Sequence, residues 1–264
     1  MAVKILADKA DDPIDDKPMP LLEHLVELRR RLLWSALAFF LCFGVCYYFS
    51  RDIYSFLVQP LAHILEQRGG NRRMIYTQLY EAFFTYLRVA FFGAAFVSFP
   101  VVASQVYLFV APGLYRSEKR AIQPFLAATP ILFVAGAALA YYFIFPAAWS
   151  FFLSFETPTG AGGLPIELEA KVSEYLSLVM KLIFAFGVAF QLPVLLTLLA
   201  KVGIVTSGGL KKYRRYAWVG MFIVAAIITP PDVITQTGLA LPLIALYEIS
   251  IQTAKLVERK PADV

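Results

Sequence analysis

The stretch that decides the fold is AIQPFLAATPILFVAGAALAYYFIFPAAWSFFLSF, residues 121–155, which contains no charged side chain. A helix that crosses the hydrocarbon core of a bilayer needs roughly 20 consecutive apolar residues. This run is longer than one straight crossing requires. We therefore predict that a membrane-spanning helix ends at Pro146, because proline cannot continue the hydrogen-bond pattern of a helix, and that residues 147–155 lie along the interface.

Further uncharged runs lie on both sides of this stretch, at residues 32–49, 89–115, 182–200, 217–229 and 233–247. They predict an all-α polytopic membrane protein with one transmembrane domain over residues 20–256. Its six helices are expected at about 32–50, 83–110, 121–146, 174–200, 214–229 and 233–254. Residues 1–19 are polar, acidic and proline-containing, which predicts a disordered cytoplasmic tail, and residues 257–264 form a second cytoplasmic tail.

The composition agrees with a membrane protein. Of the 264 residues, 59% are hydrophobic and 16% are charged, whereas soluble domains are typically about 25% charged. The net charge of +5 does not indicate a nucleic-acid partner, because the Lys and Arg residues sit at the ends of the apolar runs. Cys42 and Cys46 are the only cysteines, so they cannot complete a metal site, and no cofactor is expected.

The last two runs are short and are joined by Pro230-Pro231-Asp232, a sequence that forces a turn. At 1.5 Å per residue each run reaches roughly 20–25 Å, which is less than the hydrocarbon core of about 30 Å. We expect either local thinning of the bilayer or extension of these helices by flanking residues.

The basic residues predict the orientation. Lys and Arg are concentrated before the first run, between the second and third, between the fourth and fifth, and after the sixth. Short cytoplasmic loops carry an excess of these residues, so both termini are predicted to be cytoplasmic. The first outer loop, residues 50–77, fits this pattern least well because it carries Arg51, Arg68, Arg72 and Arg73.

Two carboxylates stand on the predicted cytoplasmic side. Glu27 belongs to an amphipathic segment before the first run and has Arg31 at i+4, which by itself indicates a surface ion pair. Glu118 follows Ser117 in the loop between the second and third runs, where it could simply favour a helix start.

Gln191 is a polar residue inside the fourth run, two positions before Pro193. Two interpretations stay open. Its amide could bond a polar group of a partner protein, or it could satisfy the carbonyl of Ala189 that Pro193 leaves free, or a neighbouring helix of its own chain.

Catalytic motifs are absent from the sequence. It contains no H-E-x-x-H, no G-x-S-x-G and no phosphate-binding G-x-x-x-x-G-K-[ST] loop. We therefore predict a protein that binds and moves a substrate, and not an enzyme.

Four motifs carry a resemblance to a known family. They are HLVELRRRL at 24–32, FVAPGLYRSEKR at 109–120, FGVAFQLP at 186–193 and TPPDV at 229–233. In this order and on these helices, they resemble the TatC family, the multi-spanning receptor subunit of the twin-arginine protein translocase. The resemblance extends from about residue 19 to about residue 255.

The resemblance implies that the protein recognises signal peptides with two consecutive arginines on folded cargo. It implies that Glu27 and Glu118 form part of the recognition surface in the bacterial cytoplasmic (inner) membrane. Arg29 and Arg31 match important family positions and are expected to orient Glu27 or to contact lipid phosphate. Since no ATPase motif is present, transport by the proton-motive force agrees with the family.

The resemblance also implies small single-span partner subunits, of the TatA and TatB types, in a multimeric complex. The matching positions here are Gln191, Thr229, Asp232 and Gln236. Many family members carry Glu where this chain has Gln191, which puts a protonation-linked role of that position in doubt. Structural roles are expected for Pro60, Pro100, Phe109, Pro193, Pro230 and Pro231.

The sequence was also compared with the features of a secondary transporter and of an intramembrane protease. A small-solute secondary transporter usually shows internal repeats with broken helices in corresponding positions, and the sequence contains no such repeat. An intramembrane protease would need catalytic residues that the sequence lacks.

Overall fold

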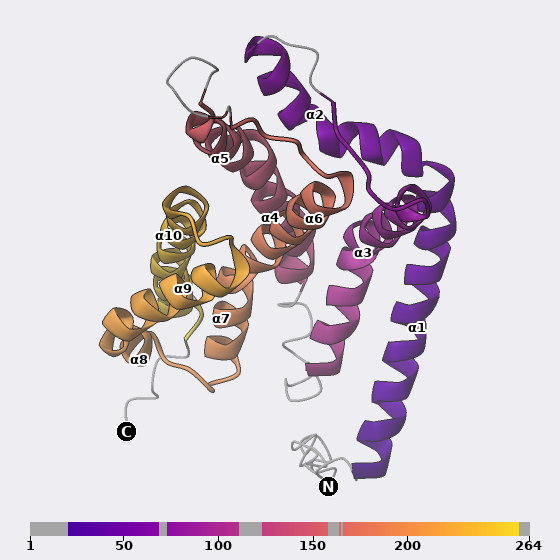
Figure 1. Ribbon diagram of the computed structural model, residues 1–264. Coiled ribbons are helices and arrows are strands. Elements are labelled where there is room, and N and C mark those ends of the chain that lie inside the picture. The colour runs from indigo at the N-terminus through magenta and orange to yellow at the C-terminus, as the bar shows by residue number, and fades with distance from the viewer. Residues whose placement is uncertain (1–20, 69–72, 111–122, 158–163, 165, 259–264) are drawn as a thin grey trace, which may run out of the picture.

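The structure is a computed structural model that describes residues 21–68, 73–110, 123–157, 164 and 166–258. Its helices are α1 (Leu21–Tyr48), α2 (Ser50–Arg68), α3 (Glu81–Val110), α4 (Gln123–Leu139), α5 (Phe145–Phe152), α6 (Val172–Ala189), α7 (Leu192–Lys201), α8 (Ser207–Lys212), α9 (Arg214–Ile228) and α10 (Val233–Val257) (Figure 1). In the described ranges, β structure is limited to two isolated bridges, Ile75–Lys171 and Thr157–Ile166. The predicted all-α membrane fold is therefore confirmed.

Five segments are long and apolar enough to cross a membrane: His24–Tyr48, Glu81–Phe109, Pro124–Phe155, Val172–Lys201 and Val233–Val257. They match five of the six predicted crossings. The sixth, α9, has 15 residues and reaches only about 22 Å at 1.5 Å per residue.

Helix α10 corrects the expectation that both of the last helices are short. It has 25 residues, or about 37 Å, because the helix continues beyond the apolar run through Val257. Glu248, in this extension, forms an ion pair of 2.7 Å with Arg214 at the start of α9. Extension by flanking residues thus accounts for α10, and only α9 remains shorter than a hydrocarbon core.

The segment before the first span is continuous with it, so α1 is a single helix of 28 residues. The next segment differs from the expected outer loop, because residues 50–68 form α2. Its apolar residues recur at helical spacing, with Leu57 and Leu61 fully buried and Ile64 and Leu65 packed on the same core. Asp52 lies in the first turn, where the helix dipole favours an acid.

Pro60 lies inside α2 and has no N–H, so it leaves the carbonyl of Phe56 without its helical partner. The hydroxyl of Tyr141 donates a hydrogen bond of 2.7 Å to this carbonyl. The hydroxyl of Tyr175 donates to the next carbonyl, that of Leu57, at 3.0 Å. These two bonds hold α2 on the rest of the bundle and agree with the structural role expected for Pro60.

Replacing Tyr141 by Phe is expected to destabilise the protein by about 1–2 kcal/mol, because the carbonyl of Phe56 then loses the donor that replaces its missing helical partner. Tyr142→Phe is the matched control, since Tyr142 is 63% exposed, and it should change stability by less than about 0.5 kcal/mol. Denaturant unfolding in detergent micelles measures both. Equal effects of the two substitutions would contradict this account of Pro60.

Pro146 does not end the third crossing, which corrects the prediction. The helix passes through a π-helical turn, Ala140–Ile144, in which the N–H of Phe145 donates to the carbonyl of Ala140, and continues as α5. The wider turn accommodates the proline ring that would otherwise clash with the preceding turn. Residues 147–155 therefore extend the helix instead of leaving it. Trp149 is buried and packs on Tyr175, with 5.4 Å between ring centroids.

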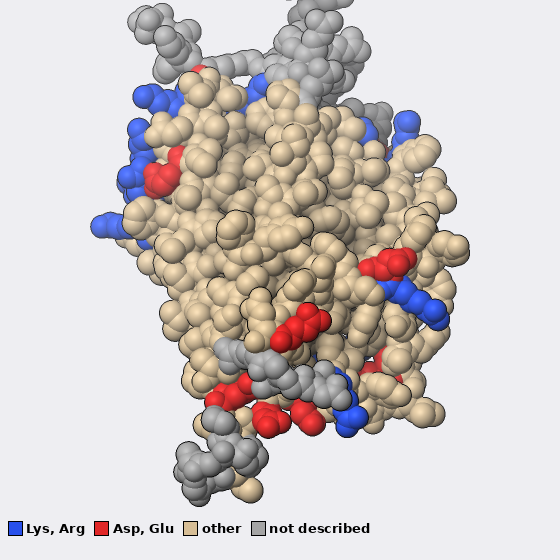
Figure 2. All heavy atoms as spheres, turned by 90° about the horizontal axis from the view of Figure 1, so that it is seen from above, with Lys and Arg blue, Asp and Glu red and all other residues tan. Residues whose placement is uncertain are grey.

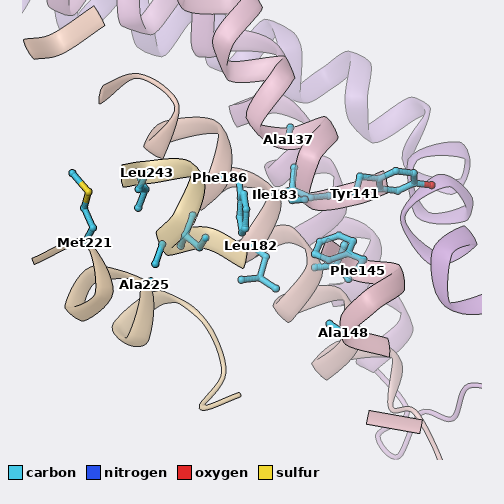
Figure 3. Packing of buried hydrophobic residues seen from close by; sticks show 14 of the residues in the cluster. Ala137, Tyr141, Phe145, Ala148, Leu182, Ile183, Phe186, Met221, Ala225 and Leu243 are labelled. Atoms are coloured by element: carbon cyan, nitrogen blue, oxygen red, sulfur yellow. The ribbon is translucent and has the colours of Figure 1, made fainter. Parts of the chain in front are cut away.

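The main core is centred on α6, whose buried Leu182, Ile183 and Phe186 belong to one hydrophobic cluster with residues of three other segments. These residues include Ala137, Tyr141, Phe145 and Ala148 of α4 to α5, Met221 and Ala225 of α9, and Leu243 of α10 (Figure 3). The approach of α4 to α6 is close because glycines face each other's helix. A Cβ on Gly136 would lie 2.5 Å from the carbonyl oxygen of Phe186.

Contacts between helix ends show which ends lie together. The start of α1 meets the end of α3 through Arg31 and Gln105, and Lys201 at the end of α7 lies over the ring of Phe125 at the start of α4. Glu258, just after α10, accepts a hydrogen bond of 2.6 Å from the hydroxyl of Ser207 at the start of α8. We call this side the terminal end.

The opposite side, the far end, joins the starts of α3 and α6. The carboxylate of Glu81 accepts hydrogen bonds from the backbone N–H of Thr77 at 2.9 Å and of Ser173 at 3.3 Å. Between the ends, large apolar side chains are exposed. Figure 2 shows charged side chains gathered mainly at two opposite edges of one face, with an almost uncharged surface between them. Such a band suits contact with lipid.

Candidate functional site

The first candidate site is at the terminal end, where Glu27 lies on α1. Arg31, one turn further on, pairs with the Glu27 carboxylate at 3.0 Å through Nη2 and donates to Oε1 of Gln105 on α3 at 3.2 Å through Nη1. The Glu27 side chain is 22% exposed. Arg31 thus orients Glu27 and connects it to a second helix.

A ring contact one turn before Glu27 supports the same arrangement. His24 stacks on Phe109 of α3 with 4.4 Å between ring centroids and 25° between the ring planes. Phe109 therefore holds the start of α1 against the end of α3, which fits the structural role expected of it. Because α1 is fixed to α3 at His24 and again at Arg31, the Glu27 carboxylate is held on a two-helix platform.

Arg29 lies elsewhere. Two residues correspond to about 200° around a helix, so Arg29 is on the side of α1 away from Glu27. It is exposed and borders a hollow of about 410 Å³, together with Arg30, Trp34 and Leu37. Of the two arginines expected to orient Glu27 or to contact lipid phosphate, Arg31 does the first, and Arg29 is free for the second.

Glu118 lies outside the described residues. The two helix ends that flank its segment, the end of α3 and the start of α4, both lie at the terminal end. Tyr107 near the end of α3 and Phe125 at the start of α4 belong to one apolar cluster. The prediction that Glu118 and Glu27 form one patch stays a prediction.

The second candidate site is the break between α6 and α7. Pro193 is in the first turn of α7, and residues 190–191 form a turn that separates the two helices. Gln191 is 92% buried here. Its Nε2 donates to the carbonyl of Thr129 on α4 at 3.0 Å and to that of Gly187 at 3.5 Å.

The structure supports the interpretation in which Gln191 bonds its own chain, and the interpretation in which it bonds a partner stays a prediction. The amide N–H₂ serves the protein's own helices, although it bonds Gly187 and not the carbonyl of Ala189 that the sequence indicated. The amide Oε1 is buried and has no partner among the described residues. A buried acceptor without a donor is costly, and a partner's donor could reach this oxygen only if the packing at the break between α6 and α7 opened.

Polar contacts extend from this break across the bundle. The Thr197 hydroxyl donates to the carbonyl of Pro193 at 2.6 Å, and it lies 2.6 Å from the hydroxyl of Thr253 on α10. The Thr129 hydroxyl donates to the carbonyl of Phe125 at 2.8 Å. Gln191 thus makes a polar contact with α4, and Thr197, further along α7, makes a separate one with α10.

The turn between α9 and α10 is built from its own residues. The N–H of Asp232 donates to the carbonyl of Pro230 at 2.7 Å, which makes the turn tight. Asp232 caps α10 by accepting from the N–H of Thr235 at 2.7 Å, as expected of a helix N-cap. The Thr229 hydroxyl donates to the carbonyl of Ala225 at 2.9 Å.

These bonds fit the structural roles expected of Pro230 and Pro231. They also occupy Thr229 and Asp232, which are 5% and 8% exposed, within the chain. Gln236 is the more accessible member of the group and makes only a long contact of 3.5 Å, from its Nε2 to the carbonyl of Phe222. Pro100 lies inside α3, where it too removes one backbone donor.

Sequence reasoning missed Gln105, Thr129 and Tyr141, which position the predicted site residues or the helices around them. Gln105 and Thr129 are isolated polar residues in charge-free runs, the same signal that drew attention to Gln191. In the described part of the chain, no group of three or more His, Cys, Asp and Glu side chains could hold a metal ion.

Comparison with known proteins decides the family. The profile described as "Sec-independent protein translocase protein (TatC)" matches residues 23–242. The chain belongs to the TatC family. It is 50% identical over 248 residues to a TatC of Magnetococcus marinus, covering 94% of this chain and 88% of that protein. It is 40% identical over 232 residues to TatC of Escherichia coli K12, covering 88% and 86%.

A solved structure agrees with the sequence comparison. The crystal structure of the twin-arginine translocase receptor TatC matches with a TM-score of 0.74 and 36% identity, covering 89% of this chain and 100% of that one. The TatC resemblance of the four motifs is therefore confirmed. The assignment to Sec-independent, twin-arginine protein translocation is also confirmed, and a small-solute transporter is not supported.

Proposed function

We propose that this protein is the receptor subunit that binds twin-arginine signal peptides at its terminal end and helps move folded proteins across the bacterial cytoplasmic membrane. The observation that carries the proposal is the Glu27 carboxylate, held by Arg31 and Gln105 on the platform of α1 and α3. Adjacent guanidinium groups pair well with carboxylates fixed in place. Glu118 supplies the second carboxylate.

Glu27 is already paired with Arg31, so a signal arginine binds it by exchange of ion-pair partners. An incoming arginine replaces Arg31 at Glu27, while Arg31 keeps its hydrogen bond to Gln105. A partly exposed pair contributes only about 1 kcal/mol, so the apolar segment of the signal supplies much of the remaining affinity. Arg29, on the other side of α1, is available to a lipid phosphate.

The terminal end faces the cytoplasm in this proposal, with both termini on that side. Basic residues support this orientation because they gather where α7 ends, α8 lies and α9 begins, at Lys201, Lys211, Lys212, Arg214 and Arg215. The protein binds and moves its cargo without a catalytic step of its own, uses no cofactor, and depends on the proton-motive force.

Site-specific photo-crosslinking tests signal binding. A photoreactive residue at Leu28, which is 41% exposed beside Glu27, should form an adduct with a twin-arginine signal peptide, and changing both signal arginines to Lys should reduce the adduct about tenfold. The control position is Val45, exposed near the other end of α1, which should give no arginine-dependent adduct. Equal adducts from the two signals at Leu28 would refute signal recognition beside Glu27.

Small single-span subunits of the TatA and TatB types are the proposed partners in a multimeric complex, along α7, α9 and α10. The unpartnered Oε1 of Gln191 supports this because docking that opens the break between α6 and α7 would let a partner's hydroxyl or amide donor satisfy it. Thr229 and Asp232 fix the turn that presents Gln236. Since an amide does not titrate, this chain holds its partner by hydrogen bonding and not by a charge at position 191.

Gln191→Leu is expected to reduce co-purification of the partner subunits about tenfold, which corresponds to 1.4 kcal/mol. Gln236→Leu, at an accessible position, should weaken recovery as well without changing thermal stability. Unchanged recovery with both variants would exclude this docking surface, and a fall in stability without loss of partner would limit Gln191 to the role it has within its own chain.

A further inference from the structure

A groove between α3 and α4 has no part in the proposed function. It is a hollow of about 360 Å³, covered on one side by α2 and backed by Ile183 of α6. Small residues are part of its lining, with Gly93 on α3 and Ala137 and Ala138 on α4.

Aromatic contacts close the groove at both ends. Toward the terminal end, Phe99 of α3 stacks on Phe133 of α4 with 3.8 Å between ring centroids. Toward the far end, Phe56 of α2 stacks on Tyr141 with 4.4 Å between centroids and 2° between planes. Phe133 and Tyr141 are eight residues apart, so the groove is about 12 Å long at the rise of an α-helix.

The groove opens sideways at membrane level. Its rim residues Val97, Val134 and Tyr142 are 59%, 53% and 63% exposed, and they lie in the interior of the spans Glu81–Phe109 and Pro124–Phe155. Its lining is apolar, and the hydroxyl of Tyr141 is already used by the carbonyl of Phe56. Water gains no partners in such a place, while an empty groove forfeits dispersion contacts along its whole wall.

The size of the groove selects its occupant. The open side of the groove lies at the level where acyl chains fill the bilayer, and its lining is apolar throughout that depth. A lipid acyl chain crosses one leaflet, about 15 Å of hydrocarbon, which is close to the length of the groove. We propose that the groove between α3 and α4 binds one acyl chain of a membrane phospholipid as a resident ligand.

The test uses the whole protein in nanodiscs that contain a phospholipid with a diazirine in its acyl chain, followed by mass spectrometry of the labelled peptides. We expect at least fivefold more label at Val97 and Val134 than at Val219 and Ile223, which are equally exposed on α9 outside the groove. Equal labelling of the two pairs would show ordinary lipid contact and would overturn the proposal.

Substitutions that fill the groove sharpen the test. Ala138→Leu places a larger side chain in the groove and should reduce labelling of Val97 at least fivefold, whereas Ala135→Leu, exposed on the same helix outside the groove, should leave it unchanged. Val134→Trp at the exposed rim should act like Ala138→Leu if that variant folds poorly. Undiminished labelling in the groove variants, or a photoreactive residue at Val97 that captures a polypeptide in native membranes, would refute a resident lipid.

Discussion

Replacing Glu118 by Ala is expected to reduce export of a reporter with a twin-arginine signal at least tenfold, while a reporter with a general secretory signal still crosses normally. The reason is that a guanidinium of the signal loses its carboxylate partner, and tenfold corresponds to 1.4 kcal/mol. The two reporters, compared in the same cells by the amount reaching the far side of the membrane, separate a specific loss from damage to the membrane.

The matched control for this substitution is Glu167→Ala, which removes an exposed acid from the segment between α5 and α6, on the opposite side of the bundle. It should leave both reporters unaffected. If both reporters cross normally in the Glu118 variant, the assignment of Glu118 is wrong. Glu27→Ala is expected to have a smaller effect, because Glu27 begins in an ion pair with Arg31 and its net contribution to signal binding is reduced accordingly.

Gly136→Ala is expected to destabilise the fold by about 3 kcal/mol, at the upper end of the range for overpacking. The added Cβ would lie 2.5 Å from the backbone carbonyl oxygen of Phe186, so α4 and α6 must separate instead of moving one flexible side chain. Loosening this contact also affects the carbonyl of Thr129, which reaches Gln191 across the same pair of helices.

Gly220→Ala is the control, because a Cβ at this position of α9 meets nothing within 4 Å. Ala is favoured over Gly in a helix by up to about 1 kcal/mol, so this variant should be neutral or more stable. Denaturant unfolding of both proteins in the same detergent measures the difference. Equal stabilities would show that the close approach of α4 and α6 does not restrict residue 136.

The crossings were predictable from the sequence because lipid imposes a strong rule on it. Residues 89–115, 121–155 and 182–200 lack charges, and the described part of each run coincides with a span in the structure. The lengths were less predictable. α10 continues past its apolar run because residues such as Glu248 need not lie in hydrocarbon, and charge-free length says nothing about where a helix stops in water.

Two wrong predictions of helix bounds involve a proline. Pro146 predicts the end of a helix because it removes a backbone donor, and Pro60 lies in a charged segment that predicts an outer loop. In both places the surrounding structure compensates, by a π-helical turn before Pro146 and by the Tyr141 hydroxyl at the carbonyl that Pro60 frees. Such compensation depends on residues more than 80 positions away in one case, which no local pattern reveals.

In the candidate sites, contacts within one helix were predictable from the sequence, and contacts between helices were not. Local spacing was sufficient for the pair of Glu27 and Arg31, because i and i+4 are neighbours on a helix. Local spacing could not identify Gln105, because Arg31 reaches it only when α1 packs on α3. It could not identify Thr129 either, because Gln191 reaches that carbonyl only when α4 packs beside the break between α6 and α7. The free Oε1 of Gln191 likewise follows only from counting every bond around it.

The most direct test of the central claim is the affinity of the purified protein in nanodiscs for a twin-arginine signal peptide, compared with the same peptide carrying two lysines. A fluorescent label on the peptide reports binding at fixed salt. We predict that the two lysines weaken binding at least tenfold, and that Glu27→Gln with Glu118→Gln removes this preference. Equal affinity for the two peptides in the unmodified protein would contradict carboxylate recognition of the arginine pair.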